Sequence, residues 1–453
     1  MTVASAAGPR SSLQMLIDDA PITAIQIRVL LLCTLVAVIE GIDLNVIPLV
    51  APLIAETWEV PTSAFGAIFA SGPVGLIIGG LLMGQFADRW GRRTGLIVTM
   101  ILMTGSTVAT AFAHNVTELL IWRIIAGVAF GGIIPASMSL VSEFLPTRMR
   151  ASVVAFVILG QSLGGLLAAV SIGLVLEHQG WQTIILDVGA ICAVMTLLLV
   201  VILPESPRYL LLRKADSARL HATVRSLRLA EMPTAATNDE GEGQQGRLKD
   251  LFTGGRALGT CLLWMTFIGA CAGVSFFMSW LTLIYTYAGK PAAVGVHATA
   301  MYNFGGIAGG LILPLFCRRL NVNLVLMVTL IVGAACSAAL GSVLSLGNPV
   351  NLALACACGI FIPGAYYLLY PPAVGFYPTA IRSTGVGAAV AFGRIGNMVS
   401  PMAAGMILSA GFGPSLVFWA MAGPLLVSAV AIAAFHRLAR GTAVRVAAPI
   451  ATI

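Results

Sequence analysis

Long apolar stretches, separated by short polar connections, fill almost the whole sequence. A helix of about 20 apolar residues, rising about 1.5 Å per residue, matches the roughly 30 Å hydrocarbon core of a bilayer. Only 9% of the residues are charged and 58% are hydrophobic, whereas about a quarter of the residues of a soluble protein are charged. The sequence therefore predicts an all-α membrane protein. The predicted spans are residues 26–50, 62–87, 94–113, 117–142, 151–175 and 182–203, then 257–285, 293–316, 322–345, 349–373, 383–408 and 412–436.

These twelve predicted transmembrane helices form two groups of six, separated by a polar, arginine-rich segment. We expect two six-helix bundles joined by a solvated linker that contains at most one short helix. The expected parts are an N-terminal tail at 1–25, a first bundle at 26–203, the linker at 204–256, a second bundle at 257–437 and a C-terminal tail at 438–453.

The basic residues predict the orientation. Of the 25 Lys and Arg, all except Arg123, Lys290 and Arg394 lie on the side that the linker shares with both tails. Because basic loops stay on the cytoplasmic side, we expect both termini in the cytoplasm, in a multi-pass protein of the inner (plasma) membrane. The net charge of +7 is spread over short loops, so we expect a lipid bilayer as partner and no nucleic acid.

An internal repeat supports the division into two bundles. Residues 144–152 and 376–384 both read F-x-P-T-x-x-R-[AS]-[ST]. A second match pairs glycines and nearby residues of the second and eighth spans, including Gly80 with Gly310. Duplicated halves of this kind are typical of transporters, with a substrate site near the midplane between the halves. We therefore expect the two bundles to be pseudo-symmetric.

The first span carries two acids, Glu40 and Asp43. They share a helix face, and an acid near the bilayer centre costs on the order of 2.5 to 3.5 kcal/mol on insertion scales. Two interpretations are open, a structural pairing with a buried arginine and a site for a proton or a substrate. Counting residues from the span ends places Glu40 and Arg394 at one depth, and Asp43 and Arg123 at another.

The loop after the second span reads G-x-x-x-D-R-x-G-R-R. The motif residues include Gly84, Asp88, Arg89, Gly91 and Arg92. This order resembles the loop motif of the major facilitator superfamily, which implies the major facilitator fold. In that superfamily the aspartate interacts with the N-terminal end of a helix in the other half, where a carboxylate is favoured. The resemblance therefore implies a conformational latch at this loop. In the second repeat Arg318 replaces the aspartate, so no equivalent latch is implied there.

Three further stretches narrow the resemblance. The first acids stand in Glu40-Gly41-Ile42-Asp43, and residues 377–387 lead into a span that carries Gly393-Arg394 and Pro401. Both are similar to motifs of the aromatic acid:proton symporter family, in particular to carriers of the phenylpropionate and hydroxybenzoate type. Arg123 with Gly127 in the fourth span fits the buried arginine of the superfamily. The resemblance covers essentially the whole chain.

The resemblance implies proton-coupled uptake of an aromatic carboxylate by alternating access. A guanidinium presents a planar fork to a carboxylate, so we expect Arg394 and Arg123 to bind the substrate anion. We expect Asp43 and Glu40 to carry the proton, since an acid that exchanges neighbours between two conformations can bind and release a proton near neutral pH. Which of the two carries it stays open. Side chains expected to contact the substrate ring are Trp280, Tyr370 and Asn303.

Two other transport functions stay open. The linker begins Pro204-Glu205-Ser206-Pro207-Arg208, which also resembles sugar porters, so a sugar or other organic-anion porter is one alternative. A drug/proton antiporter is the other, although the exporters' glycine-proline motif is missing from residues 160–165. We find no catalytic constellation, no metal-ligand pattern and no cofactor motif, and so expect a monomeric transporter, driven by the proton gradient, and no enzyme.

Overall fold

The computed structural model describes residues 13–213, 218–229 and 247–446, and every element in these ranges is helical. The predicted all-α fold class is confirmed. The elements are α1 (Leu13–Asp19), α2 (Ala24–Trp58), α3 (Thr62–Trp90), α4 (Arg92–Ala111), α5 (Val116–Phe144), α6 (Thr147–Val175), α7 (Trp181–Ile202), α8 (Pro207–Arg213), α9 (Ala218–Ser226), η2 (Leu248–Phe252), α10 (Ala257–Tyr287), α11 (Ala292–Phe316), α12 (Val322–Ser342), α13 (Asn348–Tyr367), α14 (Tyr370–Phe376), η3 (Thr379–Ile381), α15 (Arg382–Ser409) and α16 (Pro414–Val446).

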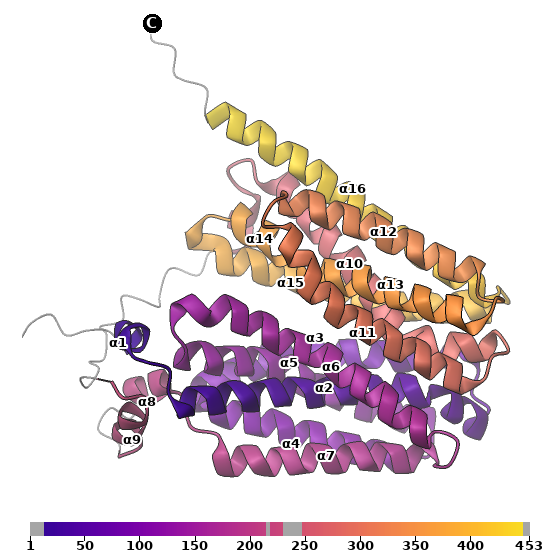
Figure 1. The fold of residues 1–453 in the computed structure, drawn as a ribbon, viewed down its shortest axis with the longest axis horizontal. Coiled ribbons are helices and arrows are strands. Elements are labelled where there is room, and N and C mark those ends of the chain that lie inside the picture. Colours follow the sequence, from indigo (N-terminus) through magenta and orange to yellow (C-terminus); the bar gives the residue numbers. More distant parts are fainter. Residues whose placement is uncertain (1–12, 214–217, 230–246, 447–453) are drawn as a thin grey trace, which may run out of the picture.

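The long helices form two bundles that lie side by side, α2–α7 and α10–α16 (Figure 1). Among the described residues, 10 helices or helix pairs are long and apolar enough to cross a membrane. The remaining long helices are α6, whose apolar part is Leu159–Val175, and α15, which carries Arg382 and Arg394. Each predicted span thus falls on a long helix or helix pair of the described chain, and ten of them have the length and hydropathy of a membrane span.

Close helix packing within each bundle depends on glycine. Helix α2 lies against α6, where a Cβ atom on Gly41 would lie 2.8 Å from the Cα atom of Gln161. No side chain larger than hydrogen fits there, so the two backbones approach directly.

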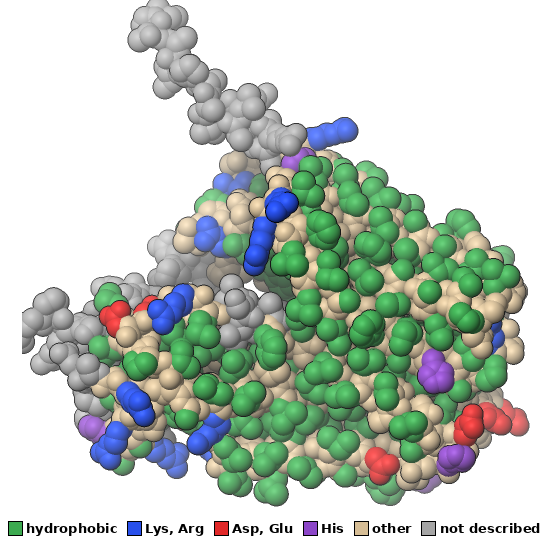
Figure 2. Space-filling model, in the orientation of Figure 1, with side chains coloured by type: hydrophobic (Ala, Val, Ile, Leu, Met, Phe, Trp, Pro, Cys, Tyr) green, Lys and Arg blue, Asp and Glu red, His purple; other side chains and the backbone are tan. Residues whose placement is uncertain are grey.

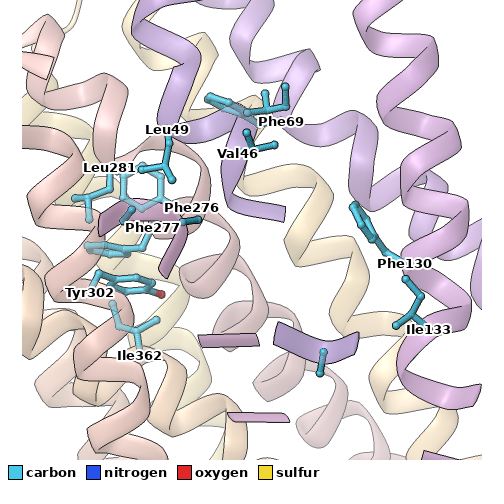
Figure 3. Packing of buried hydrophobic residues seen from close by; sticks show 14 of the residues in the cluster. Val46, Leu49, Phe69, Phe130, Ile133, Phe276, Phe277, Leu281, Tyr302 and Ile362 are labelled. Atoms are coloured by element: carbon cyan, nitrogen blue, oxygen red, sulfur yellow. The ribbon is translucent and has the colours of Figure 1, made fainter. Parts of the chain in front are cut away.

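Figure 3 shows part of the apolar core of the C-terminal bundle, where Phe276, Phe277 and Tyr302 lie together. The rings of Phe277 and Tyr302 stack with centroids 5.4 Å apart.

One end of the molecule carries α1, α8 and α9, and we call it the linker face. Here Leu210, Leu211, Leu220 and Val224 form a separate small apolar cluster. The linker thus contains α8, α9 and η2 in its described part, more helix than the single short one expected. Figure 2 shows most of the visible Lys and Arg at this face and a largely apolar surface elsewhere.

The two bundles are packed together at the opposite face and part toward the linker face (Figure 1). Helices α3 and α15 meet closely near the opposite face, where a Cβ atom on Gly405 would lie 3.0 Å from the Cα atom of Gly66. Nearer the linker face, a Cβ atom on Gly84 of α3 or Gly387 of α15 would meet none of the described residues within 4 Å. The structure is therefore open toward the linker face and closed at the other end.

Candidate functional site

A cavity of about 390 Å³ lies between the two bundles and is lined by both. Pockets that take small organic ligands have volumes of about 300–1,000 Å³. The walls are mainly apolar and aromatic, with a few polar groups from each half. Among the predicted site residues, those that line the cavity are Glu40, Arg123, Asn303, Tyr370 and Arg394.

Glu40 is the acid on the N-terminal wall. The residue is 1% exposed, and its side chain accepts a hydrogen bond from Gln161 of α6. Its Oε2 atom has no hydrogen-bond partner within the described part of the chain. A buried carboxyl oxygen without a partner is unfavourable unless it is protonated or meets a ligand. Glu40 is thus a cavity acid with an unused oxygen.

Asp43 lies one helical turn further along α2 and does not line the cavity. It is fully buried, and one oxygen accepts a hydrogen bond from Thr107 at 2.7 Å. The other oxygen lies 3.6 Å from Nη1 of Arg123, an ion pair that matches the depth predicted for these two residues. The guanidinium of Arg123 also lies over the ring of Phe130, 5.7 Å from its centroid. This pair sits behind the wall, and Arg123 alone reaches the cavity.

Arg394 is the cation on the C-terminal wall. Its Nη1 atom donates a hydrogen bond to the backbone carbonyl of Leu76 in α3, across the boundary between the halves. No carboxylate of the described residues lies within 4.0 Å of it. The half-buried guanidinium therefore has donors available for an incoming anion.

Aromatic hydroxyls surround the same space. The hydroxyls of Tyr366 and Tyr370 lie 3.4 Å apart, and Tyr367 bonds Ser162 of the other half at 2.9 Å. The hydroxyl of Tyr302 is buried without a partner in the described chain. Asn303 lines the cavity and donates to the Thr299 carbonyl at 3.0 Å, which leaves its amide oxygen as an acceptor. An aromatic ring with polar substituents fits such a wall.

Trp280 lies outside the cavity in this conformation. It is fully buried, its indole N–H donates to the Pro401 carbonyl at 3.1 Å, and its ring meets Phe69 of the other half edge to face at 5.2 Å. Trp280 thus belongs to the contact that closes the opposite face. A role in substrate contact stays a prediction.

The loop motif forms a charged cluster at the linker face. Asp88 is 74% exposed and pairs with Arg92 at 3.2 Å, and Arg92 also bonds Glu143 at 3.1 Å. All three residues belong to the N-terminal half, so Asp88 has no ion-pair partner in the other half among the described residues. Arg89 is exposed in the last turn of α3.

Gly91 and Glu205 explain the geometry of this turn. Gly91 has a φ of 105°, and a Cβ atom there would lie 2.5 Å from Oε2 of Glu205. The other oxygen of Glu205 accepts the backbone N–H of Arg93 at 3.0 Å, in the first turn of α4. Glu205 therefore places a carboxylate at a helix N-terminus within its own half.

Sequence reasoning missed several residues of the site. Gln161 and Ser162 bond Glu40 and Tyr367, but the sequence around them predicts neither contact. Thr107 had no signal in the sequence that distinguishes it from other membrane threonines. Glu205 stood in a noted motif, but its partner at the start of α4 could not be inferred from the chain order.

The family model described as Major Facilitator Superfamily matches residues 33–374 of this chain. The fold, the interhalf cavity and this match agree, and the chain belongs to the Major Facilitator Superfamily.

Relatives within the superfamily include several carriers of aromatic acids. The gallate transporter of Pseudomonas putida is 31% identical over 92% of this chain and 93% of its own length. The 4-hydroxybenzoate transporter of Acinetobacter baylyi is 28% identical over 93% of this chain and 94% of its own. The 3-(3-hydroxy-phenyl)propionate transporter of Escherichia coli K12 is 30% identical over 88% of this chain and 92% of its own length. The predicted resemblance to aromatic acid carriers is confirmed.

Solved structures show the same fold at low sequence identity. The xylose transporter XylE from E. coli, in a partially occluded inward open conformation, has a TM-score of 0.73 at 18% identity and covers 90% of this chain and 97% of that chain. A bacterial homologue of the human lysosomal transporter Spinster has a TM-score of 0.65 at 18% identity and covers 93% of this chain and 98% of that chain. The predicted major facilitator fold is confirmed.

Proposed function

We propose that this protein takes up aromatic carboxylates together with protons, by alternating access in the inner membrane, and works as a monomer. The observation that carries the proposal is one cavity with an acid on one wall and an arginine on the other. Glu40 has an unpartnered carboxyl oxygen, and Arg394 has no carboxylate partner in the described chain. A proton and a substrate anion supply what each of these groups lacks.

The substrate carboxylate binds to Arg394 and takes the place of the Leu76 carbonyl. Its ring lies among Tyr366, Tyr367 and Tyr370, whose hydroxyls suit polar ring substituents. The relatives named for gallate and hydroxybenzoate support a ring of this kind. Asn303 and Arg123 border the same space and are further candidates for substrate contact.

Glu40 carries the proton to the cavity, and Asp43 with Arg123 forms a second charged pair that repacks as the halves move. Glu40 faces the cavity, which is open toward the linker face, so it exchanges its proton with that side. The gathering of basic residues at the linker face supports its assignment to the cytoplasmic side. The structure is then inward-open, the conformation that releases substrate and proton to the cell.

The charged loop acts as a latch in the alternative, outward-open conformation. Asp88, with 74% of its side chain exposed, is available to a helix of the other half when the linker face closes. Gly91 and Arg92 shape the turn that presents it, while Gly84 leaves the facing surface of α3 flat. Arg89 adds a positive charge to the same surface.

The test is uptake of labelled 4-hydroxybenzoate, gallate and 3-phenylpropionate into proteoliposomes, with and without an inwardly directed proton gradient. We expect accumulation of at least one acid that depends on the gradient and is competed by the others. Hexoses should not compete, which separates this proposal from a sugar porter. Export of preloaded acid from the liposomes, driven by the inward proton gradient and without uptake, would instead indicate a proton antiporter. Arg394→Gln should abolish binding of the acid, because it removes the charged fork.

A further inference from the structure

The guanidinium of Arg394 reaches the backbone of α3 through a gap that a glycine leaves open. Its Nη1 atom donates to the carbonyl of Leu76. A Cβ atom built on Gly80, one turn further along α3, would lie 2.7 Å from the same Nη1 atom and 3.4 Å from Cζ. Atoms that are not bonded do not pack at the shorter of these distances. A side chain at position 80 would therefore push the end of the Arg394 side chain away from its place against α3.

This contact lies where the two halves separate. On the side of the opposite face, Gly66 and Gly405 bring α3 and α15 into direct contact. On the side of the linker face, one turn beyond Gly80, a Cβ atom on Gly84 would meet no atom of the described chain within 4 Å. Arg394 thus binds the other half at the edge of the cavity opening, and not deep in the closed seam.

We infer that Gly80 is a positioning residue, which lets the Leu76 carbonyl hold the Arg394 guanidinium while the cavity is empty. This inference rests on the proposed function. A carboxylate binds a guanidinium more strongly than a neutral carbonyl does, so the substrate displaces Leu76. When the substrate has left, a cation at the interface without any acceptor is unfavourable. The carbonyl supplies that acceptor, so the empty carrier can change conformation and return for a new substrate.

The pseudo-symmetric position in the other half provides a matched comparison. The repeat pairs Gly80 with Gly310 of α11. A Cβ atom on Gly310 would lie 2.5 Å from Leu159 of α6, across the same boundary between the halves, and 2.9 Å from Tyr367 of its own half. The steric requirement is similar, but no cation is involved. A variant at Gly310 therefore measures the effect of crowding the contact between the halves, separately from the effect of displacing Arg394.

The experiment compares two transport modes in proteoliposomes. Net uptake on a proton gradient requires the empty carrier to return, whereas exchange of labelled for unlabelled 4-hydroxybenzoate uses the loaded carrier only. In Gly80→Ala the guanidinium moves, while the helix keeps its stability because alanine is a good helix former. Because the bond joins the two halves, the inference requires the empty carrier to keep it while the halves move, and its loss then slows the empty return about tenfold or more. We expect net uptake to fall by that factor and exchange to stay within about twofold of wild type.

Two control variants accompany this one. In Gly310→Ala we expect net uptake and exchange to fall together, because the effect is steric. Gly105→Ala, in α4, should change neither rate, since a Cβ atom there meets no residue of the described ranges within 4 Å. Equal loss of both transport modes in Gly80→Ala, or no loss in either, would overturn the inference and leave the proposed function standing. Absence of exchange in the wild-type protein for every aromatic acid would refute the proposed function and this inference with it.

Discussion

Variants of the buried ion pair between Asp43 and Arg123 can distinguish its contribution to protein stability from its role in transport. The two charges lie 3.6 Å apart, and at an effective dielectric constant of about 20 they attract by about 5 kcal/mol. Much of this attraction is offset by the cost of burying both charges. Removing one partner leaves the other charge buried and unpaired, which costs about 3–5 kcal/mol. Asp43→Asn keeps an acceptor for Thr107, so the change is one of charge and not of shape.

We expect Asp43→Asn and Arg123→Met each to destabilise the protein by about 3 kcal/mol or more, and the double variant to recover most of that loss. Recovery is expected because the double variant contains no unpaired buried charge. The measurement is denaturant unfolding of the four purified proteins in detergent, with gradient-driven uptake measured in parallel. We expect neither single variant nor the double variant to accumulate substrate. Additive destabilisation would show that the pair does not interact, and full accumulation by Asp43→Asn would exclude Asp43 from the proton pathway.

Three further variants test other parts of the proposal. Glu40→Gln should retain exchange and lose the acceleration of uptake by a proton gradient, measured with the same liposomes at two external pH values. Tyr370→Phe removes the hydroxyl that lies 3.4 Å from Tyr366 and should weaken binding of ring-hydroxylated acids about fivefold relative to benzoate, measured by competition. Gly41→Ala should lower stability by about 1–3 kcal/mol, since its Cβ atom would lie 2.8 Å from the Cα atom of Gln161, whereas Gly105→Ala should not.

The depth of each charged residue in the membrane could be predicted from the sequence, because the rise per residue of a helix is nearly constant. Counting from the span ends placed Asp43 and Arg123 at one level, and in the structure they form an ion pair. The same count placed Glu40 and Arg394 at one level, and both line the cavity. The spans and their division into two bundles followed from composition and the internal repeat.

Rotation about each helix axis could not be predicted in the same way. Trp280 was expected to contact the substrate ring, but its face of α10 turns toward Phe69 and Pro401. An all-round apolar helix has no polar side that fixes its rotation, and neighbours are chosen by packing between distant segments. Gln161 shows the same limit, because nothing near it in the chain indicates Glu40 as its partner.

The strength of the proposed latch at the linker face follows from the exposure of Asp88. With 74% of its side chain in solvent, it competes for Arg92 with Glu143, which is more buried. A carboxylate at an exposed helix N-terminus contributes about 0.3–1 kcal/mol. Such an energy changes the ratio of two conformations by about two- to fivefold, far less than the roughly ten-thousandfold change that locks a protein in one state. A latch of this size favours the outward-open state without trapping it, and the binding and release of substrate and proton can still decide the direction of transport.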